Sequence, residues 1–291
     1  GMGEDLLQSE EGQSFFNHAD DILGFPLSEI IRHGPQDILA RTDVSQPAIF
    51  CVSIAYLSLV TKVLNSASIL PKYVAGHSLG EYTALVAAGA ISFSEGLRLV
   101  NLRGKLMQNA SDENPGGMAV VLGLPIEDVR TLCEKSGAHI ANINSTDQIV
   151  VSGPEEAIAR TISLSAEHNV RRIIPLEVSG AFHTHLMEPA RVGLANEVNL
   201  AQITDPSIPI VANTTALPIS SPNAVRKELS EQLCSCVLWL KTIEYMASNG
   251  VETFLEIGPG KVLSNLNKRI APNVNSISLG SLDAIGNLKV S

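Results

Sequence analysis

Apolar residues recur at helical spacing through most of the first hundred residues, with one short apolar run between the helical patterns. This periodicity predicts helices over 12–23, 27–40, 46–64, 81–89 and 94–109, and a short strand over 72–75. The third helix is expected to begin at Gln46-Pro47, because proline suits a first helical turn, and to be buried, because it is apolar nearly all round. Ser94 is the expected N-cap of the last of these helices.

The middle of the chain has a different rhythm, in which strands and helices follow in the order β-α-β-β-α-β. The strand patterns cover 118–122, 139–142, 148–152 and 172–178, and the helix patterns cover 125–135 and 153–168. This order is that of a ferredoxin-like unit. The break at 114–117 (Asn-Pro-Gly-Gly) is a candidate boundary. We therefore predict a small subdomain over 115–179, inserted into a large subdomain made of 1–114 and 180–291.

Short strands again alternate with helices in the last third of the chain. Helices are predicted over 186–201, 223–234, 240–249 and 261–270, and strands over 208–212, 251–256 and 274–279. Alternation of this kind indicates a mostly parallel sheet with helices on both faces. The predicted fold class is therefore α/β, with the parallel sheet in the large subdomain.

The composition argues against several classes of partner. The chain has 291 residues, of which 45% are hydrophobic and only 4% are aromatic, and its formal net charge is −10. An acidic chain with few aromatic residues is a poor match for nucleic acid or for an anionic membrane surface. No apolar run was expected to reach the ~18 residues of a membrane helix. We therefore expect neither nucleic acid nor a membrane as partner.

The four cysteines do not form a metal-binding pattern. Cys234 and Cys236 are separated by one residue instead of the roughly two to four usual in zinc sites, and no second pair of Cys or His ligands accompanies them. Cys51 and Cys133 stand alone. We therefore expect reduced thiols in a cytoplasmic protein without a signal peptide, and neither a metal nor a cofactor.

The clearest chemical feature is the pentapeptide Gly-His-Ser-Leu-Gly at 76–80, between a predicted strand and a predicted helix. In this context G-x-S-x-G is the nucleophile elbow of α/β-hydrolase-like folds. The glycines allow a tight turn, and the Ser78 hydroxyl projects near the positive end of the following helix. Negative charge that develops on a substrate carbonyl is favoured there. The pattern indicates acyl transfer through a serine ester, within an α/β-hydrolase-like large subdomain.

A serine hydroxyl needs a base, and the chain has seven histidines, at 18, 33, 77, 139, 168, 183 and 185. His77 adjoins the serine, but the sharp turn is expected to point its ring elsewhere. His183 and His185 both lie in a loop just after the last strand of the predicted insert, where a catalytic histidine can be placed freely. Spacing alone leaves these two as alternatives, together with the possibility that neither is the base.

Six short motifs occur in order along the chain. They are Gly76–Tyr82, Asn101–Gln108, Gly116–Met118, Asn142–Val150, Gly180–His183 and Glu256–Leu263. Together they resemble the motifs of the malonyl-CoA:acyl-carrier-protein transacylases, and the resemblance runs from residue 1 to about residue 280. It implies transfer of malonyl from malonyl-CoA to the phosphopantetheine thiol of acyl carrier protein, in type II fatty acid synthesis. It also implies a monomer.

The resemblance implies a chemical role for several residues. Ser78 would attack the thioester while His183 takes its proton. The backbone N–H of Leu79 would donate to the oxyanion. The backbone carbonyl of Leu238, where many relatives have glutamine, would orient His183. The preceding Cys-Ser-Cys at 234–236 replaces an Asn-Pro that is more usual in the family.

The resemblance also implies how the acyl group is chosen. Arg103 would clamp the free malonyl carboxylate, since a planar guanidinium matches a planar carboxylate. Phe182 goes with malonyl over methylmalonyl in the family, although a hydrophobic pocket discriminates one methyl group by only about 1–3 kcal/mol. His77, Met107 and Met118 are also expected to line the acyl pocket, while methionine also commonly fills cores.

At its start the sequence departs from the family pattern. Family members begin with a hydrophobic strand and a Pro-Gly-Gln-Gly-Ser-Gln loop, whose glutamine supplies one backbone N–H of the oxyanion hole. Residues 1–7 resemble the segment just after that loop. We expect loss of one oxyanion donor to lower turnover by ~10²–10³-fold. A start placed too late at Met2 and a natural variant both account for this, and the first is favoured because the other chemical residues are present.

Two other functions share part of these features. A serine hydrolase, such as a thioesterase or phospholipase, would use the same elbow, and Arg103 argues against it. An inactive module that binds the carrier without turnover would follow from the lack of the loop. Lys261, Lys268 and Arg269 are candidate contacts for an acidic carrier protein, with ordinary solvated charges as the alternative interpretation.

Overall fold

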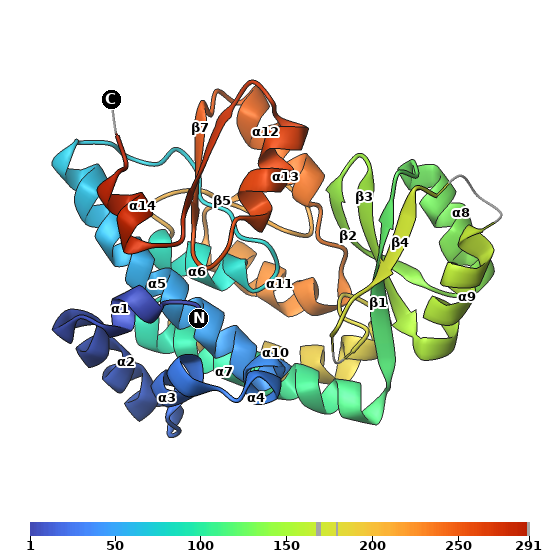
Figure 1. Cartoon of the computed structure of the whole chain (residues 1–291), viewed down its shortest axis with the longest axis horizontal. Helices are drawn as coiled ribbons and strands as arrows, with labels where there is room; N and C mark the ends of the chain where they lie inside the picture. Colours follow the sequence, from blue (N-terminus) through green and yellow to red (C-terminus); the bar gives the residue numbers. More distant parts are fainter. Residues whose placement is uncertain (167–169, 179, 290–291) are drawn as a thin grey trace.

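The computed structural model forms two lobes that lie side by side (Figure 1). It describes residues 1–166, 170–178 and 180–289. The small lobe, at the right of Figure 1, contains the described residues between 116 and 175, and the large lobe contains the other described residues. His168, at the predicted end of a helix, and Ser179, at the predicted subdomain boundary, lie outside the described residues.

The small lobe contains a four-stranded antiparallel sheet and two helices. The strands are β1 (Gly116–Leu122), β2 (His139–Ser145), β3 (Gln148–Pro154) and β4 (Arg172–Pro175), and the helices are α8 (Ile126–Ser136) and α9 (Glu155–Ser165). The strand order is β2-β3-β1-β4. Apolar residues of both helices, Leu132 and Ala157 among them, form one buried core with Val121 and Ile149 of the sheet. The ferredoxin-like unit is therefore confirmed, while its limits at 115 and 179 stay a prediction.

The large lobe is mostly helical. Its N-terminal helices are α1 (Glu4–Leu7), α2 (Glu10–Leu23), α3 (Leu27–His33), α4 (Gln36–Ala40), α5 (Thr42–Ser66), α6 (Gly80–Ala87) and α7 (Phe93–Glu113). Its C-terminal elements are η1 (His185–Met187), α10 (Glu188–Leu200), β5 (Ile210–Val211), β6 (Pro218–Ile219), α11 (Pro222–Glu231), η2 (Gln232–Cys234), α12 (Trp239–Ser248), β7 (Thr253–Ile257), α13 (Val262–Ile270), β8 (Asn275–Leu279) and α14 (Leu282–Gly286).

Several helix boundaries differ from the prediction, and for three of them the physical reason is clear. The pattern at 27–40 forms two helices, because Gly34 has a φ of 74° and Pro35 after it cannot continue a helix. Helix α5 begins at Thr42, so Pro47 lies inside it, where burial of the helix outweighs the loss of one hydrogen bond. Helix α7 is capped by Ser92 instead of Ser94, because the Ser92 side chain accepts from the backbone N–H of Glu95.

Helix α5 runs through the core of the large lobe. An 18-residue window of it has a mean hydropathy of 1.8, so the helix is long and apolar enough to cross a membrane by length and composition alone. The expectation that no segment reaches this length is therefore wrong for α5. However, 61% of that window is buried inside the protein, with Phe50, Val52 and Val60 fully buried in the main core. Its apolar surface is thus accounted for by packing within the lobe.

Parallel strand pairing in the large lobe occurs in two places. Strands β7 and β8 form a parallel pair, and Val74 forms a single parallel bridge with Ile210. Strands β5 and β6 pair antiparallel. The α/β class is confirmed. In the residues described, however, the predicted parallel sheet is present as short separate pieces, and 72–75 forms a bridge in place of a strand.

The large lobe extends the small sheet next to the serine turn. The N–H of Val237 donates to the carbonyl of Ala141, and its carbonyl accepts from the N–H of Ile143, both at 2.9 Å. A ring nitrogen of His77 lies 2.9 Å from Oδ1 of Asn144 on β2. The loop that leads into α12 and the serine turn are therefore both fastened to the same strand of the small lobe.

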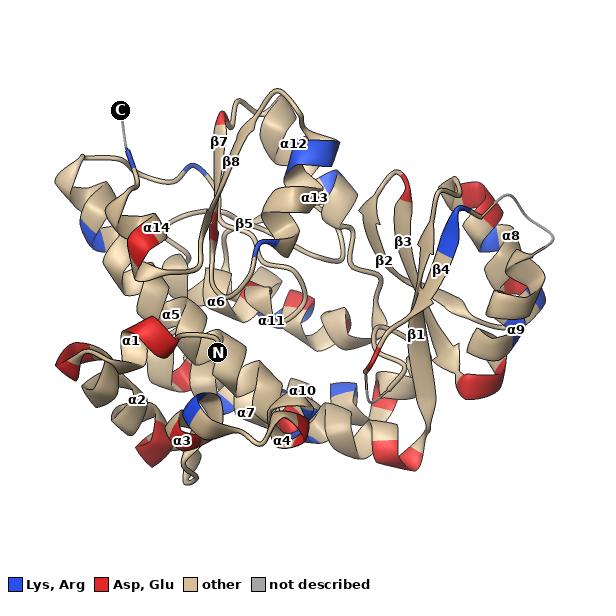
Figure 2. Cartoon of the chain, in the orientation of Figure 1, with Lys and Arg blue, Asp and Glu red and all other residues tan. Residues whose placement is uncertain are grey.

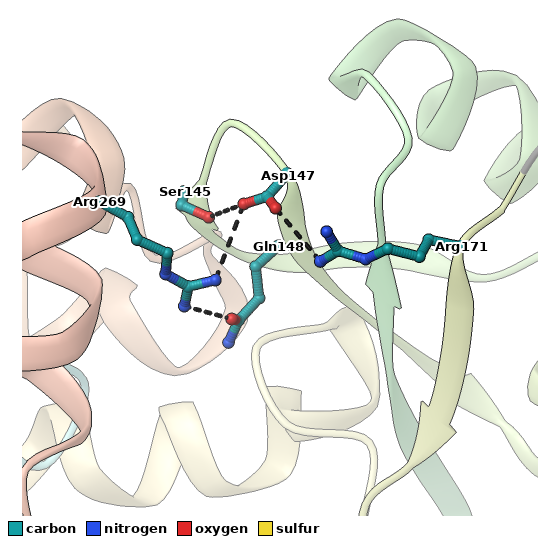
Figure 3. Close-up of polar contacts among 5 residues, drawn as sticks. All are labelled: Ser145, Asp147, Gln148, Arg171 and Arg269. Atoms are coloured by element: carbon teal, nitrogen blue, oxygen red, sulfur yellow. Dashed lines mark hydrogen bonds and ion pairs between the residues drawn. The ribbon is translucent and has the colours of Figure 1, made fainter.

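A charged cluster joins the turn between β2 and β3 to helix α13 of the large lobe (Figure 3). The carboxylate of Asp147 lies 3.3 Å from Nη2 of Arg171 and 3.8 Å from Nη1 of Arg269. The Ser145 hydroxyl donates to Asp147, and Nη2 of Arg269 donates to Oε1 of Gln148, both at 2.8 Å. The Ser145 hydrogen bond, followed by the two arginines, holds the pKa of Asp147 below its usual value. We call these five residues the Asp147 cluster.

Candidate active site

The turn at 76–80 holds Ser78 in a backbone conformation that few residues adopt. Its φ of 51° lies in the left-handed region. A Cβ at Gly76 would lie 1.9 Å from the backbone carbon of Gly80, so only glycine fits at position 76. A Cβ at Gly80 would meet nothing within 4 Å. The first glycine therefore makes the turn possible, whereas the space at position 80 would admit a small side chain.

Asn213, two residues after β5, stabilises this turn. Its Oδ1 accepts the backbone N–H of Ser78, and its Nδ2 donates to the carbonyl of Gly76, both at 2.7 Å. Oε1 of Glu81 in turn accepts from both the backbone N–H and Nδ2 of Asn213, each at 2.9 Å. These hydrogen bonds compensate for the cost of the left-handed backbone at the serine.

His183 is the histidine that faces the serine. The Ser78 hydroxyl lies 2.9 Å from Nε2 of His183, whose own φ of 60° is also left-handed. His185 is exposed, and its ring contacts that of His139, with the ring centres 5.0 Å apart. His77 points toward Asn144 and Trp239 and away from the serine, as the sharp turn led us to expect. The geometry therefore favours His183 over its two competitors.

Two backbone carbonyls orient the His183 ring, and neither is that of Leu238. Nδ1 lies 3.0 Å from the carbonyl oxygen of Gln232 and 3.1 Å from that of Ser235. The Leu238 carbonyl accepts instead from the N–H of Thr242 in α12. The prediction for Leu238 is wrong, because the tight turn η2 and the extended Ser235 after it bring earlier carbonyls to the ring. With its proton held on Nδ1, the ring presents Nε2 as an acceptor.

The surroundings of His183 keep its ring neutral. Burial lowers the pKa of His183 to about 3, and the positive charge of Arg103 acts in the same direction. At neutral pH the ring therefore carries no charge, which is the state a proton acceptor needs. The nearby carbonyls oppose this shift only in part.

Arg103 on α7 brings a buried positive charge to the serine. Its guanidinium is 1% exposed, and Nη2 donates to the Ser78 hydroxyl at 2.9 Å and to Oε1 of Gln232 at 3.0 Å. Nη1 donates to Oε1 of Gln46 at 2.5 Å, and the guanidinium carbon lies 5.7 Å from the ring centre of Tyr82. Although burial lowers the pKa of Arg103, a guanidinium stays charged at neutral pH. The serine oxygen thus lies between a proton acceptor and a cation.

The backbone N–H of Leu79 is available to an oxyanion. Leu79 directly precedes α6, at the positive end of that helix. Within the part of the chain that the structure describes, its N–H makes no hydrogen bond. Its oxyanion role stays a prediction.

The residues expected to line the acyl pocket lie in two places. Met107 is 2% exposed, and its sulfur accepts from Nε2 of Gln46 at 3.3 Å, directly beside the contact between Gln46 and Arg103. Met118 belongs to a small core on the sheet of the small lobe, against which Phe182 packs. Met107 therefore lies near Arg103. Phe182 directly precedes His183 in the sequence. That they contact an acyl group stays a prediction.

A cleft of about 750 Å³ between the lobes reaches His183 and Leu238 from the side of the exposed His185. His139 and Cys236 also line it, whereas none of the four predicted pocket side chains, His77, Met107, Met118 and Phe182, does so. The four cysteines are free thiols, and the described ranges contain no group of three or more His, Cys, Asp or Glu side chains that could hold a metal. The absence of a cofactor stays a prediction.

Four buried polar residues of this site were not predicted from the sequence. They are Gln46, Glu81, Asn213 and Gln232. Each adjoins a feature that the sequence analysis did use: a proline, the serine motif, the strand at 208–212 and the Cys-Ser-Cys segment. The available signal for such a site residue was a polar residue at the edge of an apolar run. The sequence does not show which of many such residues come together at the site in the folded protein.

The chain is similar to known proteins along nearly its whole length. Residues 1–279 match the family model of the acyl transferase domain. The malonyl CoA-acyl carrier protein transacylase of Bacillus subtilis (strain 168) is 37% identical over 291 residues, which cover 98% of this chain and 90% of that protein.

Solved structures give the same result. The crystal structure of an acyl-carrier-protein-S-malonyltransferase from Bartonella henselae superposes with a TM-score of 0.93 at 38% identity, over 98% of this chain and 93% of that one. A malonyl-transacylase in complex with its type II PKS acyl-carrier protein superposes with a TM-score of 0.92 at 36% identity, over 98% and 93% of the two chains. The chain therefore belongs to the acyl transferase domain family, as a member of the malonyl CoA-acyl carrier protein transacylases.

Proposed function

We propose that this protein transfers a malonyl group from malonyl-CoA to the phosphopantetheine thiol of an acyl carrier protein, through an ester on Ser78. One observation carries the proposal: the Ser78 hydroxyl oxygen lies 2.9 Å from Nε2 of His183 and 2.9 Å from Nη2 of Arg103. A base on one side activates the oxygen, and a cation on the other side can receive a free carboxylate. The relatives' names support the same donor and acceptor.

In the first half-reaction the Ser78 hydroxyl attacks the thioester carbonyl of malonyl-CoA while His183 takes its proton on Nε2. The carbonyl oxygen becomes an oxyanion, to which the N–H of Leu79 donates. Collapse of this intermediate breaks the carbon–sulfur bond. The CoA thiolate leaves with the proton from His183, and malonyl remains as an ester on Ser78.

In the second half-reaction the carrier's phosphopantetheine thiol gives its proton to His183 and attacks the ester carbonyl. Collapse breaks the bond to Ser78, whose oxygen takes the proton back. The ring returns to its neutral state, which is the stable one because the pKa of His183 is lowered to about 3. A transient imidazolium in this site is a strong acid, so it readily returns the proton to the leaving group.

Arg103 would select the acyl group. The carboxylate carbon of a malonyl ester is three bonds from the serine oxygen, and Nη2 of Arg103 is 2.9 Å from that oxygen. A guanidinium so close can bind the carboxylate through two parallel hydrogen bonds. A charge-assisted contact of this kind is absent for a neutral acyl group such as acetyl. The packing of Phe182 against Met118 would limit room at the malonyl α-carbon.

The carrier would dock on helix α13. Lys261, Lys268 and Arg269 are exposed there, and Val262 among them is 66% exposed. Figure 2 shows basic residues on α12, α13 and β4, whereas α1 and α2 at the far side of the large lobe carry acidic ones. A local basic surface with an apolar residue in it is suited to an acidic helical partner, even though the net charge of the chain is −10. We further propose that the protein acts as a monomer in the cytoplasm, without a membrane partner, and that it takes part in fatty acid synthesis.

The test is a transfer assay with malonyl-CoA and a carrier protein that bears phosphopantetheine. The proposal predicts malonyl-carrier as the main product and a malonyl ester on the peptide that contains Ser78, both lost in Ser78→Ala. Release of malonate at the same rate with and without the carrier would instead identify a hydrolase. A folded protein that binds the carrier but forms no ester on Ser78 would identify a binding module.

A further inference from the structure

Gln232 contacts the three residues on which the proposed chemistry depends. Its backbone carbonyl lies 3.0 Å from Nδ1 of His183. Its side-chain oxygen accepts from Nη2 of Arg103, and its Nε2 donates to the backbone carbonyl of Ser78, both at 3.0 Å. The side chain is 1% exposed. One buried residue therefore touches the base, the cation and the backbone of the nucleophile.

The orientation of the Gln232 amide follows from its neighbours. Arg103 can only donate, so Gln232 has to present Oε1 to it. Nε2 then faces Glu81, whose Oε2 accepts from it at 2.5 Å. The other oxygen of Glu81 accepts two N–H groups of Asn213. Each hydrogen bond from Arg103 through Gln232 to Glu81 then joins a donor to an acceptor. This holds only when Glu81 accepts at both of its oxygens.

Glu81 also places a buried carboxyl group close to the buried guanidinium. Both side chains are 1% exposed, and an uncompensated buried charge is costly. In the described residues no carboxylate lies within ion-pair distance of Arg103, which contacts two amides and a hydroxyl. Burial and then the neighbouring carboxylate of Glu228 raise the pKa of Glu81 well above its usual value, while the N–H donors of Asn213 and Gln232 favour its charged form. Glu81 thus lies one amide group away from Arg103, and the guanidinium is left without a direct ion pair.

We propose that Glu81 and Gln232 are positioning residues that keep Arg103 aimed at the serine and available to a substrate carboxylate. Glu81 holds Nε2 of Gln232, so that Oε1 of Gln232 holds the guanidinium. A glutamate in direct contact with Arg103 would neutralise it, whereas an amide between the two orients it and leaves its charge free. The inference rests on the proposed function and deepens it, since it names the residues that set the preference for acyl groups with a free carboxylate.

An exchange of the two side chains tests this pairing. Glu81→Gln places an amide NH₂ among N–H donors, and the easiest relief is a turn of the Gln232 amide that sets Nε2 against Arg103. Gln232→Glu sets two carboxylates face to face. The double variant Glu81→Gln/Gln232→Glu restores one donor–acceptor contact between the two positions and the original net charge. It also sets a carboxylate directly against Arg103. The exchange is therefore expected to regain the stability lost in the single variants but not the preference for malonyl.

The measurement is the ratio of kcat/KM for malonyl-CoA to that for acetyl-CoA, because a purely structural defect would lower both values together. Each single variant is expected to lower the ratio by about tenfold or more, and the exchange variant, in which a carboxylate at position 232 pairs directly with Arg103, is expected to keep the ratio low. Gln108→Glu, at a buried amide on the same helix as Arg103, is the matched control and should leave the ratio unchanged. Far-UV circular dichroism and thermal melting verify that each variant is folded.

Two outcomes would overturn the inference: single variants whose ratio stays within a factor of two of the parent, or an exchange variant whose ratio returns to that of the parent. If Glu81→Gln does not fold, Gln232→Met, which removes the amide without adding charge, must show the same fall in the ratio. Labelling of Ser78 by a fluorophosphonate separates the two proposals. A parent that labels but forms no malonyl ester contradicts the proposed function, whereas a parent that forms the ester while the variants keep its selectivity contradicts the positioning role alone.

Discussion

Two charged clusters in this protein bring distant segments together, and they differ in burial. The first surrounds Arg103, which is 1% exposed and whose hydrogen-bond partners Gln46, Ser78 and Gln232 are uncharged. The second is the Asp147 cluster, where the Asp147 side chain is 38% exposed and the two arginines are 62% and 44% exposed (Figure 3). The surface cluster forms direct ion pairs, whereas the buried one separates its charges by an amide.

The difference in exposure to solvent explains why only the surface cluster uses direct ion pairs. Exposed ion pairs are screened by water and salt and contribute a median of about 0–1 kcal/mol. Inside the protein the same charges interact far more strongly and cost far more when unpaired. The buried cluster can therefore bias chemistry at Ser78, and the Asp147 cluster can only adjust how the turn between β2 and β3 rests on α13.

The largest effect in the buried cluster is expected from removal of the base. His183→Ala should lower kcat for malonyl transfer by about 10²–10⁴-fold, the usual contribution of general acid–base catalysis. The measurement is the rate of acyl-enzyme formation by rapid mixing. His185→Ala is the matched control, because that ring is exposed two residues away. A loss in His185→Ala equal to that in His183→Ala would contradict the assignment.

Removal of the buried cation should act on selectivity. Loss of a charge-assisted contact to the substrate costs about 2–5 kcal/mol. Arg103→Ala should therefore lower kcat/KM for malonyl-CoA by roughly 30-fold or more, and that for acetyl-CoA by much less. Arg103→Lys keeps the charge but not the planar fork and should fall between the two. Arg98→Ala, an exposed arginine on the same helix, should change neither value, and an equal loss for both thioesters in Arg103→Ala would remove its selecting role.

The pH dependence of acylation should show the burial directly. Protonation of the base stops the reaction, so the rate falls as the pH drops through the pKa of His183. Burial lowers that pKa to about 3, and acylation at saturating malonyl-CoA should therefore stay level from neutral pH to about pH 5. An ordinary histidine would lose half its activity near pH 6.5. A fall in the single-turnover rate centred near that value would contradict a buried neutral ring.

The smallest effect is expected from the Asp147 cluster. Asp147→Asn should lower the free energy of unfolding by at most about 1 kcal/mol, with a smaller loss at high salt. Because the pKa of Asp147 is lowered in the folded state, its contribution is present at neutral pH and is lost as the pH falls through that lowered pKa. Urea titrations at two salt concentrations measure it. A salt-independent loss of several kcal/mol would place this cluster in the same class as the buried one.

The fold was predictable where the hydrophobic pattern alone decides it. The four strands and two helices of the small lobe alternate in a regular order, and each was expected within a few residues. The segment at 72–75 was expected as a strand and forms a single bridge at Val74, because its partner at 210–211 is itself only two residues long. The pattern of one segment does not report the length of the strand beside it.

The site was predictable only where a motif marks it. Ser78 lies in a five-residue signature, and the family motifs single out His183 and Arg103. The carbonyls that orient the ring belong to Gln232 and Ser235, and the prediction of Leu238 failed because the tight turn before it depends on tertiary contacts. Convergence of polar residues from separate elements is a property of packing, which spacing along one chain does not encode.

The proposed selection of malonyl by Arg103 is tested most directly when two thioesters compete to acylate Ser78. Equal amounts of malonyl-CoA and acetyl-CoA are offered to the protein in the absence of carrier, and the ester on the peptide that contains Ser78 is identified by mass spectrometry. The account predicts mainly the malonyl ester in the parent and a loss of that preference in Arg103→Ala. Equal malonyl and acetyl esters in the parent, or an unchanged preference in Arg103→Ala, would contradict it.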